Sequence, residues 1–414
     1  MSDLQLKDDF PTVTRDDWQA LAAKGLKGAP FDSLESHTED GLNRGPLADL
    51  ADRPAQAEAL PRSETTLLDG RAWHIAAPVE DQDLAFTNAQ LLEDLKGGAS
   101  AARLSDCLPL TRRSDLKRLF EGVHTDLIPI QFAPSDTNAE RVEWALNLDE
   151  FRSARLDAGL HPRIDEAFIS ESVATVPRAW KLMGLNAAAI HEQGGTDVQE
   201  LAYLAATFAD AFRRHGTDTA TQTVVDVACD RDAHLSVVKF RAARRLVLSV
   251  AEAFGADGSD IPIHAVSSRR MMQSEDAWTN LLRLMSAGFG AVVGGASQIA
   301  LRPFTDPLGP ATPFAYRVSR NMQLMMMEES HLGQVADAAH GSYWHERMTE
   351  DLAQAAWRAF QSIEAQGGIA VSRAEVDFLA SVREADHART ERGDPILGVT
   401  LHPAEGVKLP ETRA

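Results

Sequence analysis

The sequence has few cysteines and no long apolar run. Cys107 and Cys229 are the only thiols in 414 residues. Two thiols in a chain of this length do not suggest a disulfide framework, so the composition predicts a reducing, cytoplasmic location. The longest weakly polar run, 288–300, is too short and too rich in glycine to cross a bilayer. The N-terminus is acidic and has no apolar segment, so we expect no signal peptide.

Positive charge is also scarce. The chain has 41 lysines and arginines against 61 acidic residues, which gives a net charge of −20. This balance disfavours non-specific binding to nucleic acids and to anionic membranes, although it allows a local basic pocket for a phosphorylated ligand. No dinucleotide-binding fingerprint, Walker loop or zinc-ligand spacing is present. The length allows one large α/β domain with appendages, or two domains.

The residue pattern divides the chain into three segments. Residues 1–75 are irregular and rich in proline and glycine, and we expect an arm that lies over another surface. Residues 76–333 alternate strand-like and helix-like stretches, and 334–414 is helical and then polar. Repeated strand-then-helix units predict a parallel sheet with helices outside. Six or seven such units are closer to a (β/α)8 barrel than to a two-layer sandwich.

The expected elements follow from apolar periodicity and from turn residues. Strands are expected at 101–104, 127–132, 164–172, 185–190, 221–228, 261–266 and 291–295. Helices are expected at 87–95, 115–120, 137–146, 197–215, 235–254, 274–287, 312–333, 348–366 and 372–382.

A polar, glycine-rich loop follows the expected strand at 185–190. It consists of His191-Glu192-Gln193-Gly194-Gly195 and precedes a long amphipathic helix. Thr196 and Gln199 are spaced as a capping box, and Gly216 stands where a C-terminal cap belongs. Loops of this kind lie at the carboxyl end of a parallel sheet, where ligands bind. His191 is therefore a candidate functional residue, and the alternative is a histidine that only hydrogen-bonds its neighbours.

Two further loops collect polar groups beside expected strands. One spans 264–270 and the other spans 294–298. Together with the His191 loop, they predict a pocket for an anionic, carbonyl-bearing ligand. The arginines at 269 and 270 have an alternative role as surface ion-pair partners of the many acids. The candidate substrate-binding residues are Gln193, His264, Ser267, Arg269 and Gln298.

Several stretches resemble one known family. Residues 277–283 contain Ala-Trp-Thr-Asn, and Gly-Gly-Ala-Ser-Gln-Ile follows at 294–299. A second stretch, 320–333, ends in Glu-Glu-Ser-His-Leu-Gly. They are similar to the substrate barrel of adenosylcobalamin-dependent methylmalonyl-CoA mutases. That ending and the motif at 191–201 resemble the small subunit of the two-subunit bacterial enzymes most. The resemblance covers roughly residues 15 to 400.

The resemblance implies a TIM-type barrel and the radical isomerisation of methylmalonyl-CoA and succinyl-CoA. It places His191 where the family's histidine bonds the thioester carbonyl, and His264 at the seventh-strand histidine. It also implies losses. The family's glutamine and histidine of the eighth-strand loop become Gly294 and Ala296. The tyrosine that precedes the first barrel strand in catalytic members has no counterpart, because the first tyrosine is Tyr203.

Three hypotheses remain open at this stage. The first is a non-catalytic small subunit whose arm at 1–75 wraps a catalytic large subunit in a heterodimer. Because a C-terminal cobalamin-binding domain would need more than a hundred residues after about 410, adenosylcobalamin is then expected on another chain. The second is a catalytic acyl-CoA mutase barrel that uses a separate cobalamin-binding chain, as the retained His191 and His264 favour. The third is an acyl-CoA-binding or regulatory barrel without a mutase partner.

Overall fold

Eight parallel strands close into a barrel in the computed structural model, which describes residues 13–55, 57–62, 71–135, 137–403 and 406–413. Each strand pairs with the next along the chain, and the eighth returns to the first. The strands are β1 His74–Val79, β2 Ala101–Leu104, β3 Pro129–Phe132, β4 Arg155–Leu160, β5 Lys181–Asn186, β6 Thr223–Cys229, β7 Ile263–Ser267 and β8 Gln298–Ala300. The predicted (β/α)8 barrel is confirmed.

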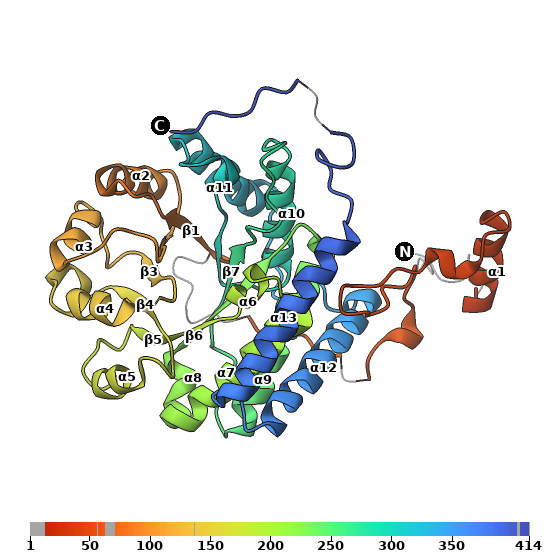
Figure 1. Ribbon diagram of the computed structural model, residues 1–414, viewed down its shortest axis with the longest axis horizontal. Helices are drawn as coiled ribbons and strands as arrows, with labels where there is room; N and C mark the ends of the chain where they lie inside the picture. Colours follow the sequence, from red (N-terminus) through yellow and green to blue (C-terminus); the bar gives the residue numbers. More distant parts are fainter. Residues whose placement is uncertain (1–12, 56, 63–70, 136, 404–405, 414) are drawn as a thin grey trace, which may run out of the picture.

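Helices surround the strands on the outside (Figure 1). They are α2 Leu84–Lys96, α3 Arg113–Leu119, α4 Asn138–Leu146, α5 Glu166–Ser172, α6 Ala188–Glu192, α7 Asp197–His215, α8 Thr219–Gln222, α9 Ala233–Ala253, α10 Asn280–Val293 and α11 Pro313–Leu324. A π-helical turn at Met325–Glu329 extends α11. Of the helices that the structure describes, none is long and apolar enough to span a membrane.

The main apolar core lies between the strands and the surrounding helices. Leu182, Val225 and Phe240 are almost completely buried in this layer. A second, much smaller apolar cluster contains only Ala76, Ala101 and Ala300. The main core is therefore outside the barrel wall, and the cluster of small side chains leaves the lumen to polar residues.

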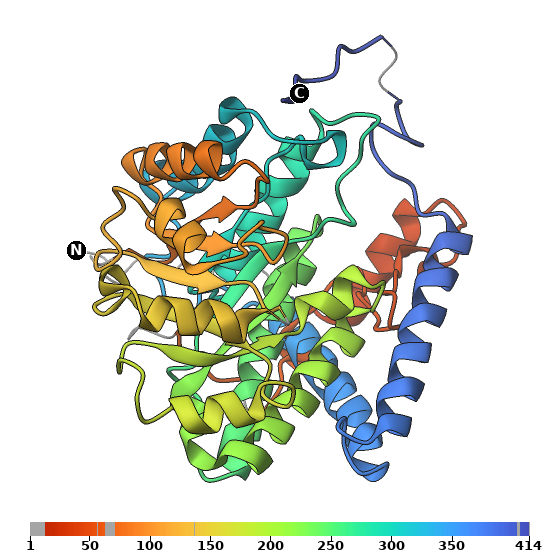
Figure 2. The ribbon, with the colours of Figure 1, turned by 60° about the vertical axis from the view of Figure 1, so that its left-hand side comes forward.

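Two segments outside the barrel pack on its α7–α9 side. α12 Tyr343–Ala365 lies against α7 and α9, and α13 Ser372–Arg392 follows it. The N-terminal arm crosses the same side, where Arg44 pairs with Asp232 at 2.9 Å. The arm's own helix, α1 Arg15–Gly25, has no buried residue and stands clear of the barrel in Figure 1. Figure 2 shows the long α13 lying across the outside of the molecule.

Three expected elements in the barrel segment are wrong. The stretch at 164–172 contains α5, and the strand of that region is β4. β4 carries charged residues at alternate positions, Arg155 and Asp157, so it is not a continuous apolar run. The strand expected at 185–190 is β5, which ends at Asn186, so that His191 lies on α6. The apolar run at 291–295 contains the end of α10, because a short apolar run has the same pattern in a buried strand and in a buried part of a helix.

The last of these errors changes the geometry of the predicted site. β8 begins at Gln298, so the loop at 294–298 lies at the amino end of that strand. Gly294 and Ala296 therefore precede β8 and do not belong to the eighth-strand loop at the ligand-binding face. His264 likewise lies within β7 and not on the loop that follows it.

Candidate functional site

His191 is buried on α6, with only 1% of its surface exposed. Its Nδ1 lies 3.1 Å from Arg270 Nη2, and its Nε2 lies 2.8 Å from Ser268 Oγ. Because a guanidinium can only donate, Nδ1 accepts, and we assign the ring proton to Nε2. Burial, aided by the positive charges of Lys239 and Arg270, holds the pKa of His191 well below its usual value. The ring is neutral and both nitrogens are engaged.

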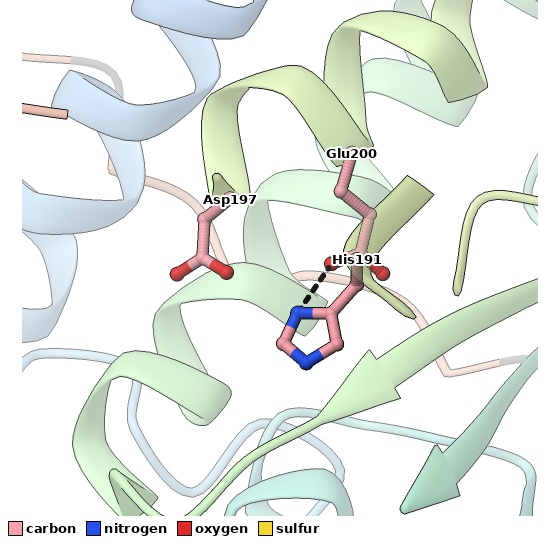
Figure 3. A group of neighbouring side chains, drawn as sticks. All are labelled: His191, Asp197 and Glu200. Carbon is pink, nitrogen blue, oxygen red and sulfur yellow. Dashed lines mark ion pairs between the residues drawn. The ribbon is translucent and has the colours of Figure 1, made fainter. Parts of the chain in front are cut away.

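Two carboxylates, those of Asp197 and Glu200, lie beside this histidine (Figure 3). Glu200 is fully buried and accepts hydrogen bonds from Ala228 N at 2.7 Å and from Lys239 Nζ at 2.8 Å. The same Nζ lies 2.9 Å from Asp197 Oδ1. Burial alone would lower the pKa of Lys239, but the two carboxylates raise it above its usual value.

The geometry of this cluster invites comparison with a metal site. His191, Asp197 and Glu200 bring potential ligand atoms within 4.8 Å of one another. However, the ammonium of Lys239 contacts both carboxylates, and Arg270 occupies His191 Nδ1. The chain's own cations therefore neutralise the carboxylates, and we assign a structural role to the cluster.

Polar side chains from opposite strands meet inside the barrel. Arg103 of β2 lies 3.0 Å from Asp226 of β6. Gln131 of β3 donates to Asp226 at 2.8 Å, and Gln298 of β8 donates to Gln131 at 2.7 Å. None of these strand pairs is adjacent in the barrel, so each contact crosses the lumen. His264 of β7 lies 4.0 Å from Asp226. We call these five side chains the lumen plug.

The environment of the plug favours neutral forms of nearby groups. Burial lowers the pKa of His264 well below its usual value, and the positive charge of Arg103 adds to this. Asp157 of β4, 4.0 Å from His264, is partly buried, with 17% of its side chain exposed, and burial raises its pKa to about 6. Close packing of charges in a low-dielectric lumen disfavours further ionisation.

A cavity of about 250 Å³ lies at the carboxyl ends of the strands. Arg103 is among its lining residues, so the cavity adjoins the lumen plug. Two further arginines border it: Arg302 pairs with Glu80 at 3.2 Å, and Arg269 N donates to Glu192 at 2.8 Å. The lining residues are Pro78, Glu80, Arg103, Ser105, Asp106, Ala133, Pro134, Asn186, Ala188, Ala189, Glu192, Val266, Arg269, Ala300 and Arg302.

The residues predicted from the sequence do not converge on this mouth cavity. Of the six, only Arg269 is among its lining residues. His264 and Gln298 belong to the lumen plug. Ser267 is buried, and its hydroxyl accepts a hydrogen bond from Arg302 N at 2.9 Å. Gln193 is exposed at the end of α6, and His191 packs against the α7 and α9 network.

Three plug residues, Arg103, Gln131 and Asp226, were not predicted from the sequence. Each lies on a stretch that was correctly expected to be a strand. Asp226 interrupts a run of β-branched residues, and Arg103 is two positions from the inward Ala101. Because side chains alternate along a strand, these polar positions signalled an inward-facing polar set.

Comparisons with known proteins agree with this fold. Residues 165–399 match the model of the family described as methylmalonyl-CoA mutase. The chain belongs to the methylmalonyl-CoA mutase family. Its relative named methylmalonyl-CoA mutase small subunit in Streptomyces virginiae is 33% identical over 97% of this chain and 72% of its own length. The relative of the same name in Propionibacterium freudenreichii subsp. shermanii is 30% identical over 99% of this chain and 72% of its own.

Relatives with a different name share less sequence. The Rhizobium meliloti protein named methylmalonyl-CoA mutase is 23% identical over 94% of this chain and 64% of its own length. Among these mutase-family relatives, the chain is therefore more similar to those named small subunit. This agrees with the resemblance of the motifs at 191–201 and 328–333.

Proposed function

We propose that this chain is the small, non-catalytic subunit of an adenosylcobalamin-dependent methylmalonyl-CoA mutase, in which it stabilises a larger catalytic subunit. Isomerisation of methylmalonyl-CoA and succinyl-CoA would take place in the partner. The lumen plug is the observation that carries this proposal. Arg103, Gln131 and Gln298 cross the space that an acyl-CoA would have to enter.

The site residues support a structural role for the inherited histidines. A histidine that bonds a thioester carbonyl needs a ring nitrogen available to the substrate. Both nitrogens of His191 already have protein partners, and the ring does not line the mouth cavity. His264 lies within the plug. The mutase hypothesis that assigns catalysis to this barrel therefore finds little support in its geometry.

The mouth cavity does not fit a corrin cofactor. Pockets for drug-sized ligands measure about 300–1,000 Å³, and a corrin is larger than such ligands. This cavity measures about 250 Å³, and no histidine is among its described lining residues. This supports the proposal that another chain of the assembly holds adenosylcobalamin.

The N-terminal arm supports a role in assembly. Apolar side chains along it are exposed to solvent, including Leu21 at 69% and Leu50 at 67%. Exposed apolar residues that lie close together on a protein surface favour burial by a second protein. Glu39 pairs with Arg392 of α13 at 2.9 Å, and this ion pair anchors the arm to the C-terminal helix α13.

Co-expression tests the proposal. This chain would carry the only tag, and the longer mutase-family chain of the same organism would be co-expressed. We expect the longer chain to co-purify in a one-to-one ratio and the complex to isomerise methylmalonyl-CoA once adenosylcobalamin is added. Failure of the longer chain to co-purify contradicts the proposal.

A variant of the same complex tests the catalytic alternative. His191→Gln keeps a polar side chain at the position but removes the imidazole. We expect kcat of the complex to stay within about twofold. A loss of 10²-fold or more, the scale of a removed proton-transfer or transition-state hydrogen-bonding group, would instead assign catalysis to this barrel. Thermal unfolding of the variant separates this result from misfolding.

A further inference from the structure

The outward surface of α10 is unusually apolar for a helix on the outside of a barrel. Leu282 is 63% exposed and Phe289 is 37% exposed. They are seven residues apart, so they lie on one face of the helix. Trp278, which is 38% exposed, lies four residues before Leu282. A surface helix normally places charged residues on this face.

The only charged residue of α10 does not reach that surface. Arg283 is 6% exposed, and its guanidinium donates to Asn280 Oδ1 at 2.7 Å and to Leu397 O at 2.5 Å. By comparison, the neighbouring helix α11 is twelve residues long and carries two charged residues, Arg317 and Arg320. A helix that is apolar on all sides is typical of a position buried on all sides.

The C-terminal tail enlarges this apolar surface. Trp278 Nε1 donates to Lys408 O at 2.9 Å, which holds the tail near the start of α10. Apolar side chains next to these anchor points are also exposed, with Leu397 at 48%, Val407 at 49% and Leu409 at 43%. We call the six residues Trp278, Leu282, Phe289, Leu397, Val407 and Leu409 the α10 face.

The net charge of the chain disfavours two possible partners for the α10 face. Each chain carries a net charge of −20, so two copies repel one another, and anionic lipid surfaces are repelled as well. Trp278 and Phe289 are of residue types that are enriched at protein–protein interfaces. The relatives that share 30–33% identity are named small subunits, and such a name implies a larger protein partner.

We infer that the α10 face is the docking surface for the larger mutase subunit. This inference rests on the proposed function and adds the location of the interface. In this assembly the arm and the α10 face would both contact the larger subunit.

The double variant Leu282→Glu/Phe289→Glu tests the inference in the co-expressed complex. Both substitutions place a charge on the α10 face at exposed positions, so the isolated chain should fold normally. The matched control is Leu127→Glu/Ile164→Glu, whose positions are 65% and 62% exposed outside this face. We expect the test variant to raise Kd for the larger subunit at least tenfold and the control to leave it within twofold. Leu282→Ala/Phe289→Ala repeats the test without added charge should the glutamates prevent folding.

The outcomes separate the inference from the function on which it rests. If a folded test variant binds the larger subunit as tightly as the wild type does, the α10 face is not the docking surface. The proposed function is unaffected by that result. No binding by the wild-type chain overturns both. In that case, sedimentation of the wild-type and variant chains identifies a second copy as the occupant only if a dimer is lost on substitution.

Discussion

Buried ionisable side chains define this molecule at the scale of single residues. Glu200 forms a buried ion pair with Lys239 beside α6, and Asp226 forms one with Arg103 in the lumen. A charge buried in a protein is tolerated only when it is paired and hydrogen-bonded. These positions therefore contribute to stability without needing a ligand.

Lys239→Met should strongly destabilise the isolated chain. The substitution leaves the Glu200 carboxylate buried without its cation, a defect that costs about 3–5 kcal/mol. Urea unfolding of the variant measures the loss. Lys117→Met is the control, because that lysine is 65% exposed and pairs with Glu150 only at 3.6 Å, so the free energy of unfolding should change by less than about 1 kcal/mol.

The ion network around Glu200 and Lys239 predicts that divalent metals do not change the stability of the chain. Ammonium and guanidinium groups already neutralise the atoms that a cation would use. Zinc or a chelator should leave the Tm of the wild-type chain unchanged. A rise in Tm that grows with zinc concentration and disappears in Glu200→Gln would show metal binding and contradict the structural role.

Asp157 makes stability depend on pH in a definite direction. Burial raises its folded pKa to about 6, against about 3.9 in an unfolded chain. The folded state therefore binds the proton more tightly, and the free energy of unfolding falls as pH rises from about 4 to about 6. Asp157→Asn removes this loss. At pH 7.5 the variant should be more stable by about 2 kcal/mol, with the difference closing towards pH 4.5.

Denaturant unfolding at several pH values provides the check. A variant that is less stable than wild type by the same amount at pH 5 and pH 7.5 would show that the Asp157 carboxylate is held by favourable contacts. The burial of the group would then not dominate its ionisation.

At the scale of elements, α7 organises the side of the barrel that carries α9 and α12. Its start is fixed by a reciprocal capping box: Thr196 Oγ1 accepts from Gln199 N, and Gln199 Oε1 accepts from Thr196 N. The arm adds a third contact, because Asp40 accepts from Val198 N at 3.2 Å. The first turn of α7 is thus where the arm meets the barrel.

Thr196→Ala should cost about 1 kcal/mol of stability through loss of the cap. Thr137→Ala is a matched control, because Thr137 occupies the equivalent position of α4 but makes no side-chain cap. Its substitution should change the free energy of unfolding by less than about half as much. Equal effects at the two positions would contradict the assignment of the stabilisation to the capping bond.

The elements also show which parts of the fold a sequence can reveal. The bounds of α7 were predicted correctly because capping residues and helical periodicity are local. The start of β8 was missed, because the run at 291–295 is apolar in either structure. The lumen plug could not be predicted from the sequence, because Gln131 and Gln298 are 167 residues apart and come into contact only when the barrel closes. The three polar loops were expected to converge, but one lies at the amino end of its strand.

At the scale of the whole molecule, the barrel combines a closed lumen with apolar outer surfaces. Its mouth cavity is small, while the arm and the α10 face expose large apolar side chains. A subunit that contributes stability and contact area, and leaves the chemistry to its partner, fits this distribution.

The number of acyl-CoA molecules bound per assembly tests the central claim most directly. The complex of this chain with the larger mutase chain, without adenosylcobalamin, would be titrated with succinyl-CoA by calorimetry. A closed lumen in this chain predicts one acyl-CoA per pair of chains and none on this chain alone. Two acyl-CoA molecules per pair, or binding by the isolated chain that Arg103→Ala alters, would contradict the account.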